Sequence, residues 1–367
     1  MNALTKADLL EWLREGKPAR LQSLYERADS VRKERVGDAV HLRGLIEISS
    51  HCERQCMYCG LRKANRQLTR YRMTREEILN CALQAEQLGY GTVVMQAGED
   101  HELTAEWIEE IVWWIKRETR LAVTLSLGER SEDELRRWRA AGADRYLLRF
   151  ETSDLELFRT IHPALSLTAP SRLTMLKKIK AMGYETGGGV MVGIPGQSFE
   201  SLAQDILTFR KLNLDMIGIG PYIAHAATPL GSGALRPAID SVEQVPSSAE
   251  MVYKMIALTR IVRPDANIPS TTALATIDKT DGRAMGLRVG ANVVMPNLTP
   301  TKYRRLYEIY PGKVCIDESV VDCNECLRGQ IHSLGRFAGR GSGSRGTVET
   351  PAGVMADAAS ALVHLQA

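Results

Sequence analysis

The chain has 367 residues, of which 44% are hydrophobic and 25% charged, and its formal net charge is +3. This length and composition allow a large buried core, and a charge so close to balance argues against nucleic acid or another polyanionic partner. The polar first residues are unlike a signal peptide, and no apolar run approaches membrane length. The sequence therefore predicts a cytoplasmic protein with no membrane partner.

Residues 1–40 contain two amphipathic patterns, which predict an N-terminal helical extension. From residue 41 onward, short apolar runs alternate with patterns typical of amphipathic helices. The apolar runs predict eight strands, near residues 41–48, 91–96, 121–126, 144–150, 186–192, 214–220, 268–273 and 291–295. The helices between them are predicted near residues 75–88, 104–118, 131–141, 170–182, 199–212, 248–262 and 281–288. Eight successive βα units predict an α/β fold, a complete (βα)8 TIM-type barrel over residues 41–298.

Two segments follow the predicted barrel. Residues 299–334 form a C-terminal segment that carries a second cysteine site, and residues 335–367 form a tail rich in glycine, arginine and serine. This composition is typical of a mobile linker, and a short docking helix is expected within residues 355–365. The chain is thus divided into an extension (1–40), a barrel (41–298), a cysteine segment (299–334) and a tail (335–367).

A cysteine-rich loop follows the first predicted strand. Cys52, Cys56 and Cys59 have the spacing C-x3-C-x2-C, and three thiolates so close together can hold three irons of a 4Fe-4S cluster, which leaves the fourth iron open for chemistry. A structural zinc site is the alternative, but His51 is too close in sequence to Cys52 to complete a tetrahedron easily. Plain buried cysteines are a further alternative, although the loop is polar. Cys81, in a helical pattern, is expected to be core.

The cysteine spacing, with Tyr58 before the last cysteine and a predicted βα barrel around it, resembles the signature of the radical S-adenosylmethionine (SAM) superfamily. This resemblance implies that SAM chelates the open iron through its amino and carboxylate groups. It further implies that one electron from the reduced cluster cleaves SAM and releases a 5′-deoxyadenosyl radical. In a βα barrel such chemistry collects at the C-terminal ends of the strands.

Candidate SAM-binding residues are found at those strand ends, and the resemblance assigns cofactor binding to Tyr58, Gln96, Ala97, Gly98, Glu99, Ser126, Glu151, Arg172 and Met191. The small residues after strand two permit close backbone approach, although a tight βα turn would look the same. Glu151 follows a buried strand and needs partners, which a ribose diol or the SAM ammonium would supply. Arg172 is expected to pair with the SAM carboxylate, the alternative being an ordinary solvated helix arginine.

Further segments, among them residues 71–74, 142–149, 267–273 and 291–297, resemble the HydE family of FeFe-hydrogenase maturases. The resemblance covers residues 41–330 and implies a small iron complex with carbonyl, cyanide and cysteine ligands as the substrate. It implies maturation proteins of the HydG and HydF types as partners, with ferredoxin or flavodoxin as an electron donor. The alternatives are a methylornithine-synthase or biotin-synthase type enzyme and, in another class, an iron–sulfur scaffold without turnover.

The expected substrate has anionic ligands, which need fixed positive charge and hydroxyl donors. Arg145 and Arg149 lie on one face of strand four by its period of two, and hydroxyl groups follow from strands three and seven. The predicted substrate-binding residues are therefore Thr124, Arg145, Arg149, Thr271 and Thr272. Tyr307 and Tyr310 match tyrosines that in HydE approach the radical and the substrate, which makes them catalytic candidates. Simple packing of a C-terminal helix is the alternative for both.

A second cysteine set, Cys315, Cys323 and Cys326, has the spacing C-x7-C-x2-C. Many HydE proteins carry this pattern, and by resemblance it holds an auxiliary iron–sulfur cluster with one site left for a non-protein ligand. A zinc site completed by His332 is the alternative.

Overall fold

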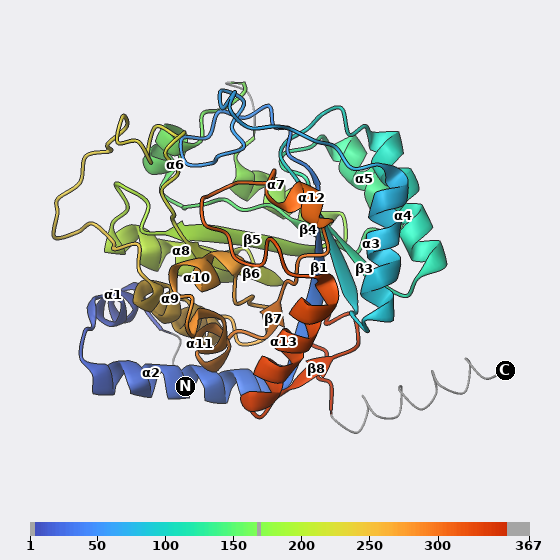
Figure 1. Cartoon of the computed structure of the whole chain (residues 1–367). Helices are drawn as coiled ribbons and strands as arrows, with labels where there is room; N and C mark the ends of the chain where they lie inside the picture. The colour runs from blue at the N-terminus through green and yellow to red at the C-terminus, as the bar shows by residue number, and fades with distance from the viewer. Residues whose placement is uncertain (1–3, 167–169, 351–367) are drawn as a thin grey trace.

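The computed structural model describes residues 4–166 and 170–350, and Figure 1 shows its strands curling into a sheet with helices packed around the outside. The strands are β1 (Ala39–Ser49), β2 (Thr92–Ala97), β3 (Ala122–Ser126), β4 (Arg145–Leu147), β5 (Glu185–Val192), β6 (Met216–Pro221), β7 (Val293–Val294) and β8 (Phe337–Gly339). Their order is β6-β5-β4-β3-β2-β1-β7, with β8 paired to β1, and every pair is parallel. The predicted α/β fold with a curled parallel sheet is confirmed.

Helices alternate with these strands. They are α1 (Lys6–Arg14), α2 (Pro18–Val36), α3 (Arg75–Gln87), α4 (Ala105–Glu118), α5 (Glu132–Ala140), α6 (Leu155–Ile161), α7 (Arg172–Ala181), α8 (Phe199–Lys211), α9 (Ala249–Val262), α10 (Thr272–Ile277), α11 (Gly282–Arg288), α12 (Thr301–Arg304) and α13 (Val320–Ser333). Local sequence signals determine where several of these helices begin. Thr74 and Ser131 begin α3 and α5 with capping boxes, in which Glu77 and Glu134 are the reciprocal partners.

The seventh predicted strand is reduced to single bridges. Met216, at the start of β6, pairs with Asn267, and Pro269 pairs with Val293 of β7. Residues 267–270 therefore connect the two edges of the seven-strand path. The chain then turns immediately into α10, so residues 272 and 273, which the sequence predicts as the end of a strand, are helical. This early turn keeps the strand from extending further.

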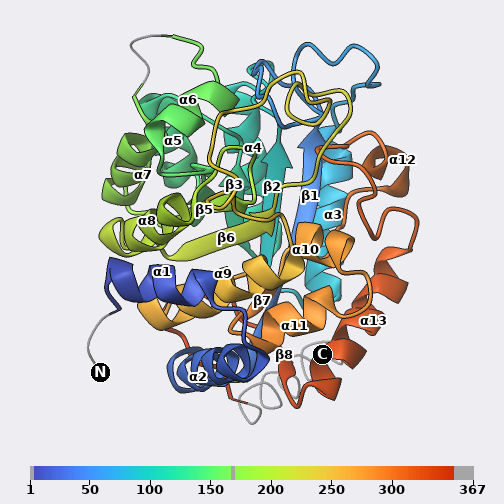
Figure 2. The ribbon, with the colours of Figure 1, turned by 90° about the vertical axis from the view of Figure 1, so that its left-hand side faces the viewer.

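The N-terminal extension packs beside the barrel wall. Figure 2 shows α1 and α2 next to α8 and α9, outside the sheet. The ammonium of Lys254 in α9 donates to the Leu13 and Glu15 carbonyls at 3.4 and 2.5 Å, which satisfies groups left free at the end of α1. The extension also contacts the loop that follows β6, because Arg14 Nη2 lies 2.7 Å from Glu243 Oε1. In residues 4–166 and 170–350, the structure contains no helix with the length and apolar character of a membrane span.

The glycine-rich tail is ordered where the structure describes it, which corrects the expectation of a mobile linker. β8 pairs with residues 39–41 of β1, and the next residues pass beneath the starts of the strands. The carbonyl of Gly343 accepts from Arg43 Nη2 at 3.0 Å and from Asn267 Nδ2 at 2.9 Å. The glycines here allow close backbone approach, a use that composition does not distinguish from flexibility. The helix expected at 355–365 lies outside the described residues.

Gly91 shows how tightly the tail is packed, because a Cβ there would lie 1.8 Å from the Gly341 carbonyl oxygen. We expect Gly91→Ala to displace the tail and to lower the free energy of unfolding by about 1–3 kcal/mol, the usual cost of overpacking. Gly329→Ala is the control, since nothing lies within 4 Å of that site inside α13 and alanine favours a helix. Chemical denaturation and limited proteolysis measure both. Equal stability of the two variants would contradict the packing of the tail.

Candidate active site

A cavity of about 340 Å³ lies inside the curled sheet, at the end where the strands finish. It gathers side chains from every strand of the predicted barrel and from the segment that follows β7. Apart from Arg145 and the second cysteine set, all predicted site residues line it: Cys52, Cys56, Tyr58, Cys59, Gln96, Ala97, Gly98, Glu99, Thr124, Ser126, Arg149, Glu151, Arg172, Met191, Thr271, Thr272, Tyr307 and Tyr310.

The cysteine loop is tied to three other parts of the barrel. The Glu53 amide donates to the Glu99 carbonyl at 2.9 Å, the Met57 amide to the Ile161 carbonyl at 2.8 Å, and the Gly60 amide to the Ile309 carbonyl at 3.0 Å. These bonds hold all three cysteines at the mouth of the cavity. The cysteines are free thiols, and burial raises the pKa of Cys56 to about 12. Because burial disfavours a lone thiolate, bound iron would be needed to stabilise that form here.

The loop fits an iron–sulfur cluster and SAM in two further respects. A Cβ at Gly98 would lie 2.7 Å from Cys52 Cβ and 2.2 Å from the His51 carbonyl oxygen, so this backbone approach requires glycine. Two buried oxygens of cavity-lining residues, Glu99 Oε2 and Thr124 Oγ1, have no hydrogen-bond partner within the described residues. Such orphaned groups are costly unless a ligand completes them.

Two arginines and two glutamates form a buried ionic cluster beside the cysteines. Arg172 Nη2 lies 3.1 Å from Glu99 Oε1, and its Nε lies 2.8 Å from Glu129 Oε1. Arg54 Nη2 lies 2.7 Å from that same Glu129 oxygen, and its Nε lies 3.5 Å from Glu99 Oε2. Arg172 is only 8% exposed, so the structure does not support the alternative of a solvated helix arginine. Its guanidinium contacts these two carboxylates and also donates from Nη1 to the Arg149 carbonyl at 2.7 Å.

The two carboxylates of this cluster respond differently to burial. Burial raises the pKa of Glu99 despite Arg172 and Arg54. Burial acts the same way on Glu129, but the charges of Arg172 and Arg54 and a hydrogen bond from Arg172 outweigh it and lower the pKa to about 2. Glu99, Glu129 and His162 are near enough to hold a metal ion, yet both arginine side chains contact them. The positive charge that an ion would supply is therefore already present.

Arg149 and Glu151 pair with each other in the cavity. Arg149 Nε lies 3.1 Å and Nη2 3.0 Å from Glu151 Oε2, and Nη2 also donates to the Val190 carbonyl at 2.7 Å. Glu151 has φ +60°, a left-handed conformation that is rare outside glycine. The expected roles, Arg149 for substrate anions and Glu151 for SAM, are thus coupled through one ion pair.

The strained turn at Glu151 is held by a buried carboxyl group, Asp205 of α8. Its Oδ1 accepts from the amide and the hydroxyl of Ser153, both at 2.6 Å. Burial raises the pKa of Asp205 to about 7. In the folded protein it therefore holds its proton more tightly than in the unfolded chain, where the ordinary value is 3.8.

From this we expect folding stability to decrease as pH rises from about 4 to 7, because the unfolded state releases the Asp205 proton first. Asp205→Asn should flatten that dependence, since asparagine keeps the accepting oxygen and does not titrate. Denaturation of both proteins across this pH range measures the difference. If the two pH dependences coincide, Asp205 is ionised in the folded state and its assignment is wrong.

The predicted tyrosines enclose one side of the cavity. Tyr307 is 1% exposed, and its hydroxyl accepts from Gln96 Nε2 at 3.2 Å. The Lys313 ammonium lies 5.4 Å from the Tyr307 ring centre and forms an ion pair with Glu47 of β1. Tyr310 is partly buried, and this burial raises its pKa. The sequence analysis missed Glu47 and Lys313, although an acidic residue inside the first apolar run was a signal.

Among the hydroxyl residues, Thr124 and Thr271 differ. Thr124 Oγ1 is unpartnered, whereas Thr271 Oγ1 begins α10 by accepting from the Leu274 amide and donates to the Ile219 carbonyl, each at 3.3 Å. Thr124 therefore retains a hydroxyl hydrogen for a ligand. Below it, Arg43 lines the cavity and forms no ion pair in the part of the chain that the structure describes. Burial together with nearby Arg145 lowers its pKa to about 9.

Arg145 does not line the cavity, which corrects its prediction as a substrate residue. It is 0% exposed and pairs with Glu185 at 2.5 Å, and it also donates to Thr92, to the Ser342 carbonyl and to Ser344 at 2.9–3.0 Å. The alternation rule gave the correct face but not the depth. Arg145 begins β4, and four residues of strand place it about 13 Å from Arg149. Its guanidinium instead holds the tail through the hydrogen bonds to Ser342 and Ser344.

The second cysteine set lies outside the cavity, on α13 and the loop before it. Cys323 and Cys326 are three residues apart on the helix, so they share a face. Cys315 has φ +61°, and a hydrogen bond from Cys323 lowers its pKa to about 6, opposed by burial and helped by Arg283. His332 follows Cys326 by six residues, about 240° around the helix, and this disfavours the alternative of a zinc site.

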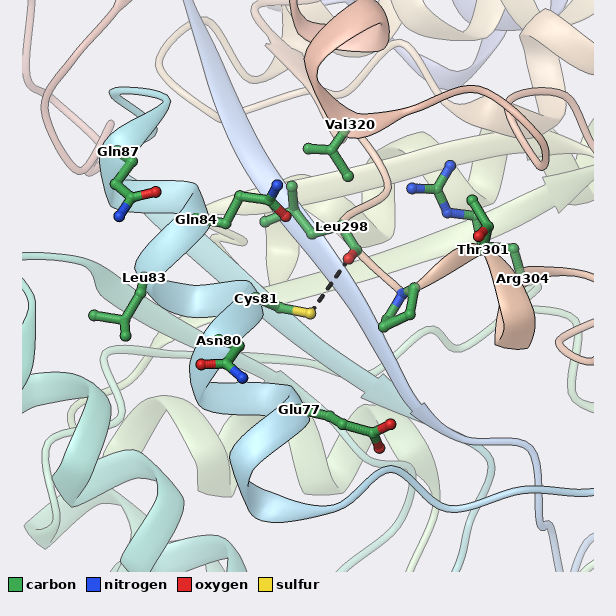
Figure 3. A pocket seen from close by; sticks show the side chains of 11 residues that line it. Glu77, Asn80, Cys81, Leu83, Gln84, Gln87, Leu298, Thr301, Arg304 and Val320 are labelled. Atoms are coloured by element: carbon green, nitrogen blue, oxygen red, sulfur yellow. Dashed lines mark hydrogen bonds between the residues drawn. The ribbon is translucent and has the colours of Figure 1, made fainter.

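A second pocket, of about 560 Å³, lies outside the sheet between α3 and the chain around α12 (Figure 3). Its one thiol is Cys81, which is 5% exposed and donates to the Leu298 carbonyl at 3.3 Å. Cys81 is thus core, as expected. This pocket brings together none of the predicted site residues.

Comparison with known proteins is consistent with this geometry. Residues 46–208 match the family model of the radical SAM superfamily. The chain is 46% identical over 324 residues to the [FeFe] hydrogenase maturase subunit HydE of Thermotoga maritima, covering 88% of this chain and 89% of that protein. The chain belongs to the HydE family of radical SAM enzymes. Members of this superfamily use a 4Fe-4S cluster and SAM.

Two solved structures share the fold. Methylornithine synthase aligns with a TM-score of 0.78 at 25% identity, covering 92% of this HydE-family chain and 95% of that one. The maturase HydG of Carboxydothermus hydrogenoformans aligns with a TM-score of 0.71 at 20% identity, covering 90% and 75%. Both likenesses support the curled parallel sheet.

Proposed function

We propose that this HydE-family enzyme uses its radical on a small iron complex with carbonyl, cyanide and cysteine ligands, in the maturation of an FeFe-hydrogenase. The observation that supports this proposal most strongly is the cavity that begins at Cys52, Cys56 and Cys59 and ends at the buried cation of Arg43, which forms no ion pair within the described residues. Anionic cyanide and carboxylate groups match such a cation. Partners of the HydG and HydF types and a ferredoxin or flavodoxin belong to the same proposal. Closure of the sheet into a complete barrel, supported by the bridges at residues 267 and 269, belongs to it as well.

In this proposal the three thiolates hold the cluster. When bound and reduced, the cluster supplies the electron that cleaves SAM to a 5′-deoxyadenosyl radical. Gly98 gives the cofactor close backbone approach, and Oε2 of Glu99 accepts from the SAM ammonium. The Arg149–Glu151 pair offers a carboxylate toward the ribose and a guanidinium toward the substrate. Thr124 donates a hydroxyl hydrogen to an anionic ligand, while Tyr307 and Tyr310 exclude water from the reacting side.

The experiment measures 5′-deoxyadenosine formed from SAM by the reconstituted, reduced protein, with and without the iron complex. We expect cleavage that the complex stimulates. Cys56→Ala is the control and should show none. Cleavage no greater than in this control contradicts an enzymatic role and supports the scaffold alternative. Cleavage without stimulation contradicts the proposed substrate and favours a methylornithine-synthase type reaction, which the shared fold leaves open.

For the second cysteine set we propose an auxiliary iron–sulfur cluster held by Cys315, Cys323 and Cys326. The shared helix face of the last two and the direct contact between the Cys315 and Cys323 side chains support it. Iron analysis of wild type against Cys323→Ala tests it. Equal iron content in the two proteins would contradict a cluster at this position.

A further inference from the structure

A buried histidine, His162, contacts the cysteine loop. It follows the last residue of α6 and is 2% exposed. Its Nδ1 lies 3.0 Å from Cys56 Sγ and 3.4 Å from the Tyr58 hydroxyl. The Met57 amide donates to the carbonyl of Ile161, the residue before His162, at 2.8 Å. The helix end and the loop are therefore fixed against each other, so that Nδ1 stays directed at the sulfur.

Arg54 determines which ring nitrogen of His162 carries the hydrogen. Arg54 Nε and Nη2 lie 3.2 and 2.6 Å from His162 Nε2, and a guanidinium has only donors. Nε2 must then accept, which places the hydrogen of the neutral ring on Nδ1. The competing acceptor, Glu129 Oε1, lies farther from Nε2 at 3.5 Å and already accepts from Arg54 and Arg172. A protonated ring would also carry hydrogen on Nδ1.

The chemistry of the Cys56 sulfur implies the same direction for this hydrogen bond. A thiolate bound to iron has no hydrogen, so Cys56 Sγ can only accept. We infer that His162 donates a hydrogen bond from Nδ1 to the Cys56 sulfur and thereby raises the reduction potential of the cluster. This inference rests on the proposed cluster at Cys52, Cys56 and Cys59. The reduced cluster carries an extra electron, and hydrogen bonds to its sulfur ligands stabilise that negative charge.

His162 is therefore a positioning residue, which acts on the cluster through its hydrogen bond to Cys56. Its ring is stacked on Phe158 with the centroids 5.0 Å apart, and this contact fixes the ring plane. The donor is directed at one of the three cysteines, so the effect on the cluster is asymmetric. Making the cluster easier to reduce lowers the demand on the electron donor without any change at the open iron.

The test is a redox titration of the reconstituted cluster, followed by electron paramagnetic resonance. In His162→Phe, which keeps the stacked ring but not the donor, the reduced-to-oxidised ratio at a fixed potential should fall about tenfold, which is 59 mV for one electron. His162→Asn keeps an N–H near the position of Nδ1 and should recover most of the shift. His41→Phe is the matched control, because His41 is equally buried but lies at the other end of β1.

A wild-type potential in His162→Phe, with the cluster intact, would overturn the inference. If His162→Phe does not fold, His162→Asn is compared with His162→Gln, whose amide reaches past Cys56. The inference then requires the higher potential in the asparagine variant, and equal potentials overturn it. A wild-type protein that binds no cluster at these cysteines would contradict the proposed function instead, so the two failures are distinguishable.

Discussion

Replacing Arg172 by methionine is expected to abolish SAM cleavage and to lower the free energy of unfolding by about 3–5 kcal/mol, the cost of leaving a buried charge without its partner. Arg172 is 8% exposed and contacts both Glu99 and Glu129. Without it, two carboxylates share Arg54 alone. Glu99 would then bind a proton, and its Oε2 would lose the charge with which it is proposed to hold the SAM ammonium.

The pH dependence of stability tests the same point. The pKa of Glu129 is about 2 in the folded protein, against an ordinary value of 4.5. Its contribution to stability is therefore complete above pH 4.5 and is lost as pH falls toward 2. In Arg172→Met we expect part of this acid sensitivity to disappear. Arg136→Met is the control, because that exposed side chain pairs only at the surface, where the effect should stay within about 0.5 kcal/mol. An Arg172→Met protein as stable as this control would refute the buried cluster.

Replacing Arg145 by methionine should destabilise the protein by a similar amount, about 3–5 kcal/mol, and free the tail for proteolysis. The change leaves Glu185 without its partner and removes the donors that hold Ser342 and Ser344. SAM cleavage per folded molecule should be retained, because Arg145 does not line the cavity. Chemical denaturation, limited proteolysis and 5′-deoxyadenosine formation measure these three quantities.

Arg149→Met provides the contrast. This side chain lines the cavity, so we expect substrate-stimulated cleavage to be lost while the tail stays protected. If Arg145→Met instead kept its stability and lost substrate stimulation, the sequence-based assignment of Arg145 to the substrate would be correct after all.

The sequence predicted the sheet and the mouth of the cavity well, for a physical reason. Parallel strands are buried on both faces and read as short apolar runs, and a barrel collects its chemistry where those runs end. Once the runs were placed, Gln96, Ser126 and Glu151 followed at neighbouring strand ends. The cysteine spacing then predicted where the iron–sulfur cluster would bind relative to these residues.

What sequence reasoning missed depends on long-range contacts. His162 sits at the end of α6, a helix of seven residues whose pattern is too short to detect, and its partner Arg54 is over 100 positions away. The ion pair of Glu47 with Lys313 spans 266 positions. The predictions for Arg145 and for the tail were wrong for one common reason. Neither the alternation of residues in a strand nor the composition of a segment shows what lies beneath the starts of the strands.

The sealed floor of the cavity constrains the order of events in a catalytic cycle. Gly343 closes the end beneath Arg43 and Asn267, while the cysteines stand at the opposite end. We expect a molecule that reaches Arg43 to enter past the cysteines, before SAM occupies that end of the cavity. For the proposed substrate we expect binding before SAM, and release of its product only after the products of SAM cleavage have left. Steady-state kinetics should accordingly be ordered, with excess SAM acting as an inhibitor.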